Sequence, residues 1–240
     1  MGRFDAARRF NLSHNGSQSS GVGKLERPCR ADYHSSFRKP LQPQISQPPP
    51  MTRDDFLSLI RTSQPGDLCR KLLLRQETAV FTNTSAYEKF RSRVSTQIRG
   101  IEEVHLAGSG KWGYSLNPQK GFKQFDTESD IDVAIISEDL FHETWNTIRE
   151  YHRNNWYAID HIRRKELRRH GENIYSGFVS PRWIPEHRSP LRFAFNRTLN
   201  RLSDANVSFR RVTALYFRNI DEAIDYYKRG FFIARSRLDK

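Results

Sequence analysis

The stretch Ser129-Asp130-Ile131-Asp132-Val133-Ala134-Ile135-Ile136 decides the fold, because it joins a run apolar enough for a central strand to two carboxylates. Nearly continuous apolar runs of this kind are typical of strands that are buried on both faces. Side chains of a strand alternate between its faces, so Asp130 and Asp132 project from the same face, roughly 6–7 Å apart along the backbone. The stretch therefore predicts a buried strand that begins with a pair of like charges.

Two carboxylates so placed repel each other, and a cation between them relieves the repulsion. Hard oxygen ligands favour Mg²⁺ or Mn²⁺, and either ion would bring a phosphate as a further ligand. A second motif, Leu106-Ala107-Gly108-Ser109, ends an earlier short strand. Gly108 lets the backbone approach an anion closely, and Ser109 adds N–H and hydroxyl donors. Together the two motifs predict phosphoryl or nucleotidyl transfer.

These motifs resemble the signature of the DNA polymerase β-like nucleotidyltransferase superfamily: a hydrophobic strand ending in Gly-Ser or Gly-Gly, then hydrophobic-Asp-hydrophobic-Asp-hydrophobic. The resemblance spans residues 101–218 and is to a minimal bacterial-type domain of this superfamily. It implies an α+β fold with a small mixed sheet flanked by helices. It also implies that Gly108 and Ser109 hold a nucleoside triphosphate, that Asp130 and Asp132 ligate Mg²⁺, and that NMP is transferred to a hydroxyl acceptor.

The chain departs from the superfamily pattern first in the insert at residues 110–125, which is longer than usual. The insert carries three lysines and four aromatic residues: Lys111, Lys120, Lys123, Trp112, Tyr114, Phe122 and Phe125. One interpretation is a phosphate clamp with a base-stacking flap, in which Lys111 and Lys123 bind phosphate together with Ser129. The other interpretation is a surface loop.

The second departure concerns the third carboxylate that active members carry on a later strand. The strand predicted at residues 207–217 contains no acid, and Arg210 or Arg211 in that position would leave the general base missing. Asp160 and Asp204 remain as candidates. Two functions therefore stay open. One is a metal-dependent nucleotidyltransferase; the other is a catalytically degenerate relative that binds a nucleotide, a nucleic acid or, as an antitoxin-type module, a protein partner.

The charge of the chain points to acidic partners. Forty Lys and Arg against 27 Asp and Glu give a net charge of +13. This charge favours RNA or another polyanion as the acceptor. The basic segment at residues 161–170 is either a solvated helix face or a patch that tracks phosphates. Tyr175, Phe178 and Trp183, nearby, either stack on bases or pack in the protein.

No apolar run is long enough to span a membrane, and the first thirty residues lack the apolar core of a secretory signal. Two cysteines, Cys29 and Cys69, are too few for a disulfide framework or a cysteine-based zinc site. These absences predict a cytoplasmic protein without a membrane partner.

The chain divides near residue 50. Residues 1–50 are rich in breakers and basic residues, which predicts a disordered tail; this tail either touches a partner or precedes a natural start at Met51. Residues 51–100 predict three helices, the first capped by Thr52, the second by Asp67 and the third within residues 82–85. Residues 101–240 predict an α+β domain with strands at 104–107, 131–136 and 207–217 and helices at 138–153, 191–202 and 220–238.

Overall fold

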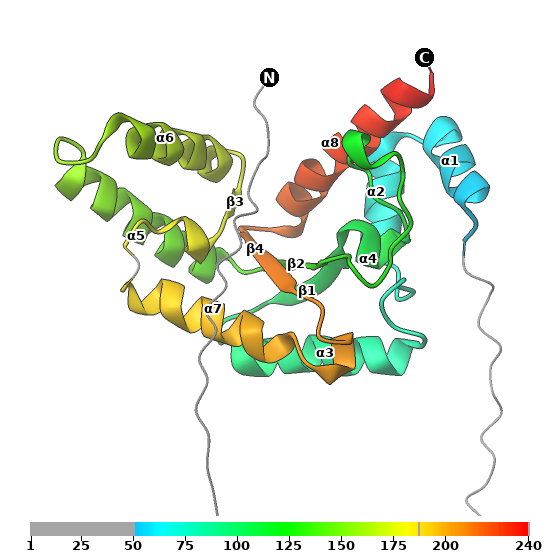
Figure 1. The fold of residues 1–240 in the computed structure, drawn as a ribbon, viewed down its shortest axis with the longest axis horizontal. Coiled ribbons are helices and arrows are strands. Elements are labelled where there is room, and N and C mark those ends of the chain that lie inside the picture. The colour runs from blue at the N-terminus through cyan, green and yellow to red at the C-terminus, as the bar shows by residue number, and fades with distance from the viewer. Residues whose placement is uncertain (1–50, 187, 240) are drawn as a thin grey trace, which may run out of the picture. The chain divides into compact units, whose positions relative to one another are not determined.

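A four-stranded mixed sheet is the scaffold in the computed structural model of the chain (Figure 1), which describes residues 51–186 and 188–239. The strand order is β1-β2-β4-β3, with β2 antiparallel to β1 and parallel to β4, and β3 antiparallel to β4. Helices and sheet together confirm the predicted α+β class, and the interior position of β2 confirms the prediction from its apolar run. The bounds are Glu103–Ala107 for β1, Ile131–Ile136 for β2, Phe178–Val179 for β3 and Val212–Phe217 for β4. The tail predicted at residues 1–50 lies outside the described residues.

Three helices precede the sheet, and their starts follow from capping. α1 (Arg53–Thr62) has the predicted capping box. The Asp55 backbone N–H donates to the Thr52 hydroxyl, and the Thr52 backbone N–H donates to the Asp55 carboxylate. α2 (Pro65–Leu74) begins before Asp67, so the prediction of Asp67 as its cap is wrong. Proline fits the first helical position, where no N–H is needed, and this sets the earlier start. α3 (Thr84–Gln97) is capped by the Asn83 side chain, inside the predicted segment.

The helices predicted after the first strands are confirmed with small changes at their ends. They are α5 (Glu138–Asn155), α7 (Pro190–Leu202) and α8 (Ile220–Leu238). Five elements were not assigned from the sequence: β3, α4 (Gly108–Trp112) and the 3₁₀ turns η1 (Pro118–Lys120), η2 (Pro181–Trp183) and η3 (Ala205–Val207). A helix at α6 (His161–Tyr175) was expected under one interpretation of residues 161–170, a solvated helix face. None of the described helices combines the length and the apolar character that crossing a membrane requires.

The strand predicted at residues 207–217 is wrong in its first part, because β4 begins at Val212. The Asp204 carboxylate accepts from the Asn206 backbone N–H, which turns the chain into η3. Ser208 and Phe209 then adopt left-handed φ values of 54° and 56°. Left-handed residues cannot continue an extended run, so the strand forms only beyond them.

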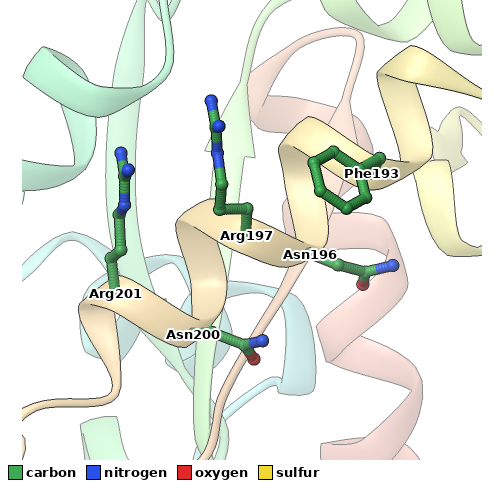
Figure 2. A pocket seen from close by; sticks show the side chains of 5 residues that line it. All are labelled: Phe193, Asn196, Arg197, Asn200 and Arg201. Atoms are coloured by element: carbon green, nitrogen blue, oxygen red, sulfur yellow. The ribbon is translucent and has the colours of Figure 1, made fainter.

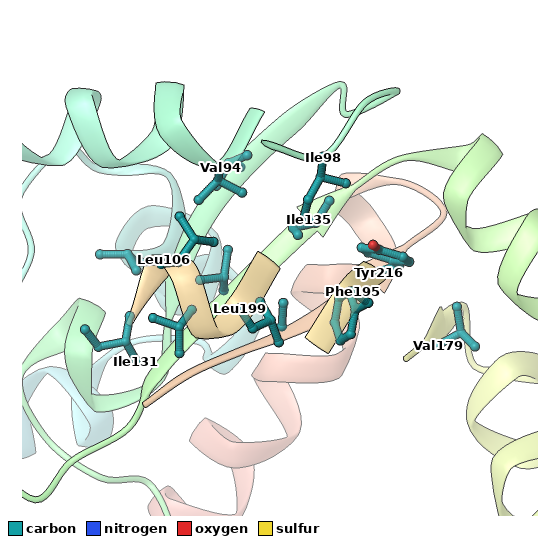
Figure 3. Close-up of a cluster of buried hydrophobic side chains, with 14 of the residues drawn as sticks. Val94, Ile98, Leu106, Ile131, Ile135, Val179, Phe195, Leu199 and Tyr216 are labelled. Atoms are coloured by element: carbon teal, nitrogen blue, oxygen red, sulfur yellow. The ribbon is translucent and has the colours of Figure 1, made fainter. Parts of the chain in front are cut away.

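Alternation along β2 divides the core into two clusters on opposite faces of the sheet. Ile131, Val133 and Ile135 pack with α3, α5 and α7, whereas Ala134 and Ile136 pack with α1, α2 and α8. Figure 3 shows Ile131 and Ile135 in the first cluster, with Val94 of α3 and Leu199 of α7. Figure 1 shows α3 and α7 on one side of the sheet and α2 and α8 on the other. By the same alternation the Asp132 side chain lies on the α8 side of the sheet, in one row with Ala134 and Ile136. The fold therefore places the carboxylate beside a helix-covered apolar face.

The left-handed turn before β4 generates a stability prediction. Phe209 is 76% exposed and strained at φ 56°, so Phe209→Gly loses little burial and should increase the free energy of unfolding by about 1 kcal/mol. Phe193 is 62% exposed within α7. Phe193→Gly should decrease the free energy of unfolding by about 1 kcal/mol, because glycine is unfavourable inside a helix. Urea unfolding measures both; a loss of stability in the Phe209 variant contradicts the strain at that turn.

Candidate functional site

The two predicted motifs meet where β1 ends. The antiparallel register places Ala107 opposite Asp132, so Gly108, the next residue, lies against the Asp132 carboxylate. Gly108 has φ +63°, and a Cβ added there would come within 2.4 Å of Asp132 Oδ2. Glycine is therefore required twice, once by the backbone conformation and once by the closeness of the carboxylate. The geometry therefore brings the Gly-Ser turn against Asp132, the second carboxylate of the pair.

Asp132 is held from its other side by β4. The parallel register places Thr213 opposite it, and the Thr213 hydroxyl donates to Asp132 Oδ1 at 2.7 Å. Burial raises the pKa of Asp132; the Thr213 hydrogen bond lowers it and the Asp130 carboxylate raises it. Burial is the largest of these effects, so the pKa stays above the ordinary value of an aspartate. Such a carboxylate is one that a bound cation would stabilise strongly.

A pocket of about 300 Å³ opens at Asp132. Its walls come from β2, η2, β4 and α8: Asp132, Val133, Ser180, Arg182, Trp183, Thr213, Ala214, Leu215, Tyr226 and Tyr227. Burial raises the pKa of both tyrosines, and the charge of Asp132 adds to the effect, so their hydroxyls are neutral donors. The space is lined on one side by a carboxylate and on the other by aromatic and hydroxyl groups.

Cations surround the two carboxylates. The positive charges of Lys120 and Arg211 lower the pKa of Asp132, which shows that they lie within electrostatic range of it. Burial lowers the pKa of Arg182, the neighbouring Arg211 lowers it further, and Asp130 raises it. Asp130 is exposed and directly precedes β2. The site thus combines two acidic residues with three basic ones, Lys120, Arg182 and Arg211.

Neither candidate for the third carboxylate lies in this pocket. Asp160 caps α6 by accepting from the Arg163 backbone N–H at 2.8 Å. Asp204 pairs with Arg93 at 2.5 Å. The position on β4 that faces Asp132 belongs instead to Thr213. Arg211 directly precedes β4, and its carbonyl accepts from the Ile131 backbone N–H at 2.9 Å.

Lys111 lies away from the pocket, in the core. Its side chain has no exposed surface, its ammonium donates to the Arg75 carbonyl, and it lies 4.7 Å from the centre of the Tyr87 ring. Burial, followed by the charges of Arg75 and Arg91, lowers the pKa of Lys111 from 10.5 to about 7. A phosphate at Asp132 is thus out of reach of this ammonium in the described arrangement.

Lys123 and Ser129, which were also predicted to bind phosphate, both contact the Asp126 carboxylate within one turn of the chain. Lys123 pairs with Asp126 at 2.6 Å, and the Ser129 hydroxyl donates to the same carboxylate at 2.9 Å. Among the lysines of the insert, the charge that reaches Asp132 is that of Lys120.

The aromatic residues of the insert serve mainly as packing. Trp112 and Tyr114 are 2% and 4% exposed and belong to the core cluster on the α8 side. The Phe56 ring stacks on Tyr114 at 5.1 Å, and the Phe231 ring lies 5.1 Å from Trp112. These contacts count against a base-stacking flap, and they also differ from the second interpretation, a surface loop, because Trp112 and Tyr114 anchor the insert in the core.

The basic segment at residues 161–170 forms most of α6, and two of its arginines contact the ring of Trp156, the residue that follows α5. The guanidinium groups of Arg164 and Arg168 lie 5.7 and 5.3 Å from the centre of the Trp156 ring. Of the aromatic residues nearby, Phe178 is in the core, Trp183 lines the pocket and Tyr175 is 95% exposed. Both interpretations of this segment remain predictions.

Most residues of the pocket were not singled out for it from the sequence, and those with functional groups suited to a ligand include Arg182, Thr213, Tyr226 and Tyr227. Each comes from a segment far from the two motifs, so local patterns carry no signal for them. Thr213 was detectable in principle, because a strand that follows the carboxylate strand in parallel must place some residue opposite Asp132. Which residue takes this position depends on the register between the two strands, and the packing of the whole sheet determines that register.

The donor set can be tested for a metal ion. In the part of the chain that the structure describes, no three His, Cys, Asp or Glu residues gather as a metal-binding group. Mg²⁺ keeps several waters and is commonly held by one or two carboxylates together with substrate phosphates. Asp130 and Asp132 fit an ion that arrives with a nucleotide, and they do not fit an ion held by protein ligands alone.

The contact between Gly108 and Asp132 predicts a difference between two glycine variants. Gly108 and Gly113 both have positive φ, at 63° and 98°, but a Cβ at Gly113 meets nothing within 4 Å. Both Gly→Ala variants should lose about 1–2 kcal/mol from backbone strain. Gly108→Ala should also displace the Asp132 carboxylate and abolish nucleotide-dependent thermal stabilisation, whereas Gly113→Ala should retain it. Equal retention by both variants contradicts a role for the close approach.

Buried Lys111 predicts a pH dependence of stability. Between about pH 7 and pH 10.5 the unfolded chain holds one proton more than the folded protein at this amine. The free energy of unfolding therefore increases with pH, by up to about 1.4 kcal/mol per unit. Lys111→Met lacks this contribution, so its stability relative to the wild type should decrease steadily from pH 7 to pH 10 in urea unfolding. Parallel stability profiles for the two proteins rule out a buried amine of low pKa.

The chain matches no protein-family model, no curated protein and no solved structure. The likeness of its motifs to nucleotidyltransferases therefore stays a prediction from the residues.

Proposed function

We propose that the pocket at Asp132 binds a nucleoside triphosphate with Mg²⁺ or Mn²⁺ and transfers NMP from it to a hydroxyl acceptor. The observation that carries this proposal is the approach of the Gly108 backbone to the Asp132 carboxylate. It supports the proposal because a turn suited to phosphate lies against one of two carboxylates suited to a metal ion, and the charge of the other, Asp130, acts on Asp132.

The residues around this contact suit the phosphates of a nucleotide. Asp130 and Asp132 would hold the metal ion, which would polarise the α-phosphate and favour ionisation of the acceptor hydroxyl. Arg182, Arg211 and Lys120 would offset the remaining negative charge of the triphosphate. The tyrosine hydroxyls of α8 and the Trp183 ring supply hydrogen-bonding and stacking groups for the nucleoside.

The proposed reaction is a displacement at the α-phosphorus. The acceptor oxygen forms a bond to phosphorus, the bond to the oxygen that bridges to the β-phosphate breaks, and pyrophosphate leaves. The acceptor proton passes to water, because Thr213 stands where a carboxylate base would otherwise face Asp132.

Thr213 also favours a second candidate function, nucleotide binding without transfer. A threonine hydroxyl is not a base near neutral pH, and it satisfies Asp132 by donating to it. A pocket of this kind retains the groups that hold a metal-bound nucleotide but lacks one that activates the acceptor. The two candidates share their ligand and differ in turnover.

Thermal unfolding of the full chain with each nucleoside triphosphate, with and without Mg²⁺ or Mn²⁺, tests the binding that both candidates require. At a ligand concentration of 100 times Kd, stabilisation is about 2.7 kcal/mol, which corresponds to a Tm increase on the order of 5–10 °C. The increase should require the metal ion and should be lost in Asp130→Asn/Asp132→Asn. Asp225→Asn, an exposed acid of α8 outside the pocket lining, is the matched control and should keep it.

Transfer of label from the α-phosphate of a nucleotide to RNA or to the protein separates the two candidates. Transfer by the wild type supports the transferase. Binding without transfer, together with transfer gained by Thr213→Asp, supports the second candidate. No Tm increase with any nucleotide overturns both.

A further inference from the structure

The outward side of α7 combines aromatic, amide and guanidinium groups. The helix buries Phe195, Leu199 and Leu202 against the sheet. Its remaining side lines a shallow pocket of about 440 Å³, here called the α7 face, which consists of Phe193, Asn196, Arg197, Asn200 and Arg201. Figure 2 shows Arg197 and Arg201 extending to one side of the helix and Asn196 and Asn200 to the other.

The α7 face is positively charged without compensation. α7 contains three arginines and no acid. Among the ion pairs between described residues, none involves Arg197 or Arg201. Asp204, which follows the helix, is paired with Arg93 of α3. Charge left unpaired on a chain of net charge +13 attracts a polyanion.

The exposed phenylalanine distinguishes this face from a merely charged one. Phe193 is 62% exposed, and the Arg197 guanidinium lies 5.9 Å from the centre of its ring. An aromatic ring beside a guanidinium is a platform on which an unpaired base stacks. The Asn200 carboxamide can donate and accept, and the Asn196 amide, whose oxygen accepts from Arg182, can donate, so both can bond base edges or the ribose 2′-hydroxyl. Bases stacked inside a duplex cannot use such a platform.

We propose that the α7 face binds single-stranded RNA, with a base stacked on Phe193 and phosphates at Arg197 and Arg201. The face adjoins the aspartate pocket through one hydrogen bond, because Arg182, which lines that pocket, donates from Nε to Asn196 Oδ1 at 3.0 Å. A strand bound on α7 would therefore reach the aspartate pocket past Arg182. Its role as the acceptor, and only that step, rests on the proposed function.

Fluorescence anisotropy of labelled U12 with the full chain tests this surface. The titration is done in EDTA without nucleotide, so that failure of the aspartate pocket does not affect the result. Arg197→Gln/Arg201→Gln should weaken binding at least tenfold and reduce the slope of log K against log salt by about 1.4, because each lost phosphate contact removes about 0.7. Phe193→Ala should weaken binding about 5- to 100-fold and leave the salt slope unchanged.

Matched variants distinguish the α7 face from general positive charge. Arg149→Gln/Arg153→Gln changes two exposed arginines at the same spacing on α5, and Phe232→Ala changes a phenylalanine of α8 that is 64% exposed. Both should bind U12 as the wild type does. Circular dichroism and thermal unfolding establish that every variant folds.

Four outcomes overturn the proposal. They are no binding of U12 by the wild type, equal losses in the α7 and matched variants, equal affinity for a duplex, and equal affinity for dT12. The last two count against stacking on Phe193 and against recognition of the ribose, respectively.

Discussion

A half-buried carboxylate that lies against a backbone is the constraint on which the described site depends. Asp132 touches Gly108 at the end of β1 and Thr213 on β4, so its place is fixed by both neighbouring strands at once. Its burial raises its pKa, and the protein offsets this cost only in part, with one hydroxyl and the charges of Lys120 and Arg211. An apolar residue at position 132 would pack at less cost, which makes the carboxylate hard to explain by stability alone.

The sequence was most informative where one strand or one helix decides the structure. The apolar run at residues 131–136, the capping box at Thr52 and the helix at residues 220–238 all depend on near neighbours, and all were predicted. The pairing of Gly108 with Asp132 followed from two motifs. In contrast, Thr213 and Arg182 reach the pocket through the register of β4 and the path of η2, which no local pattern encodes.

Lysines were the least predictable part of the site, because charge alone does not say which way a long side chain points. Lys111 is separated from Ser109 by one residue, yet α4 directs it into the core, where Tyr87 and the Arg75 carbonyl receive its ammonium. Lys123 finds Asp126 within its own turn. Lys120, nine residues beyond Lys111, is the lysine that acts electrostatically on Asp132. A long side chain of this kind takes its place from the packing around its helix or turn.

The parallel pairing of β2 with β4 also affects how the molecule reaches its folded state. These strands are neighbours in the sheet, but residues 137–211 lie between them in the chain. Contacts between such distant segments slow folding, since a long loop must close before they form. During synthesis β2, the strand that contains Asp132, leaves the ribosome well before its partner exists. Until β4 arrives, one edge of an apolar strand stays open to other chains, and this interval is when the protein would be most prone to aggregate.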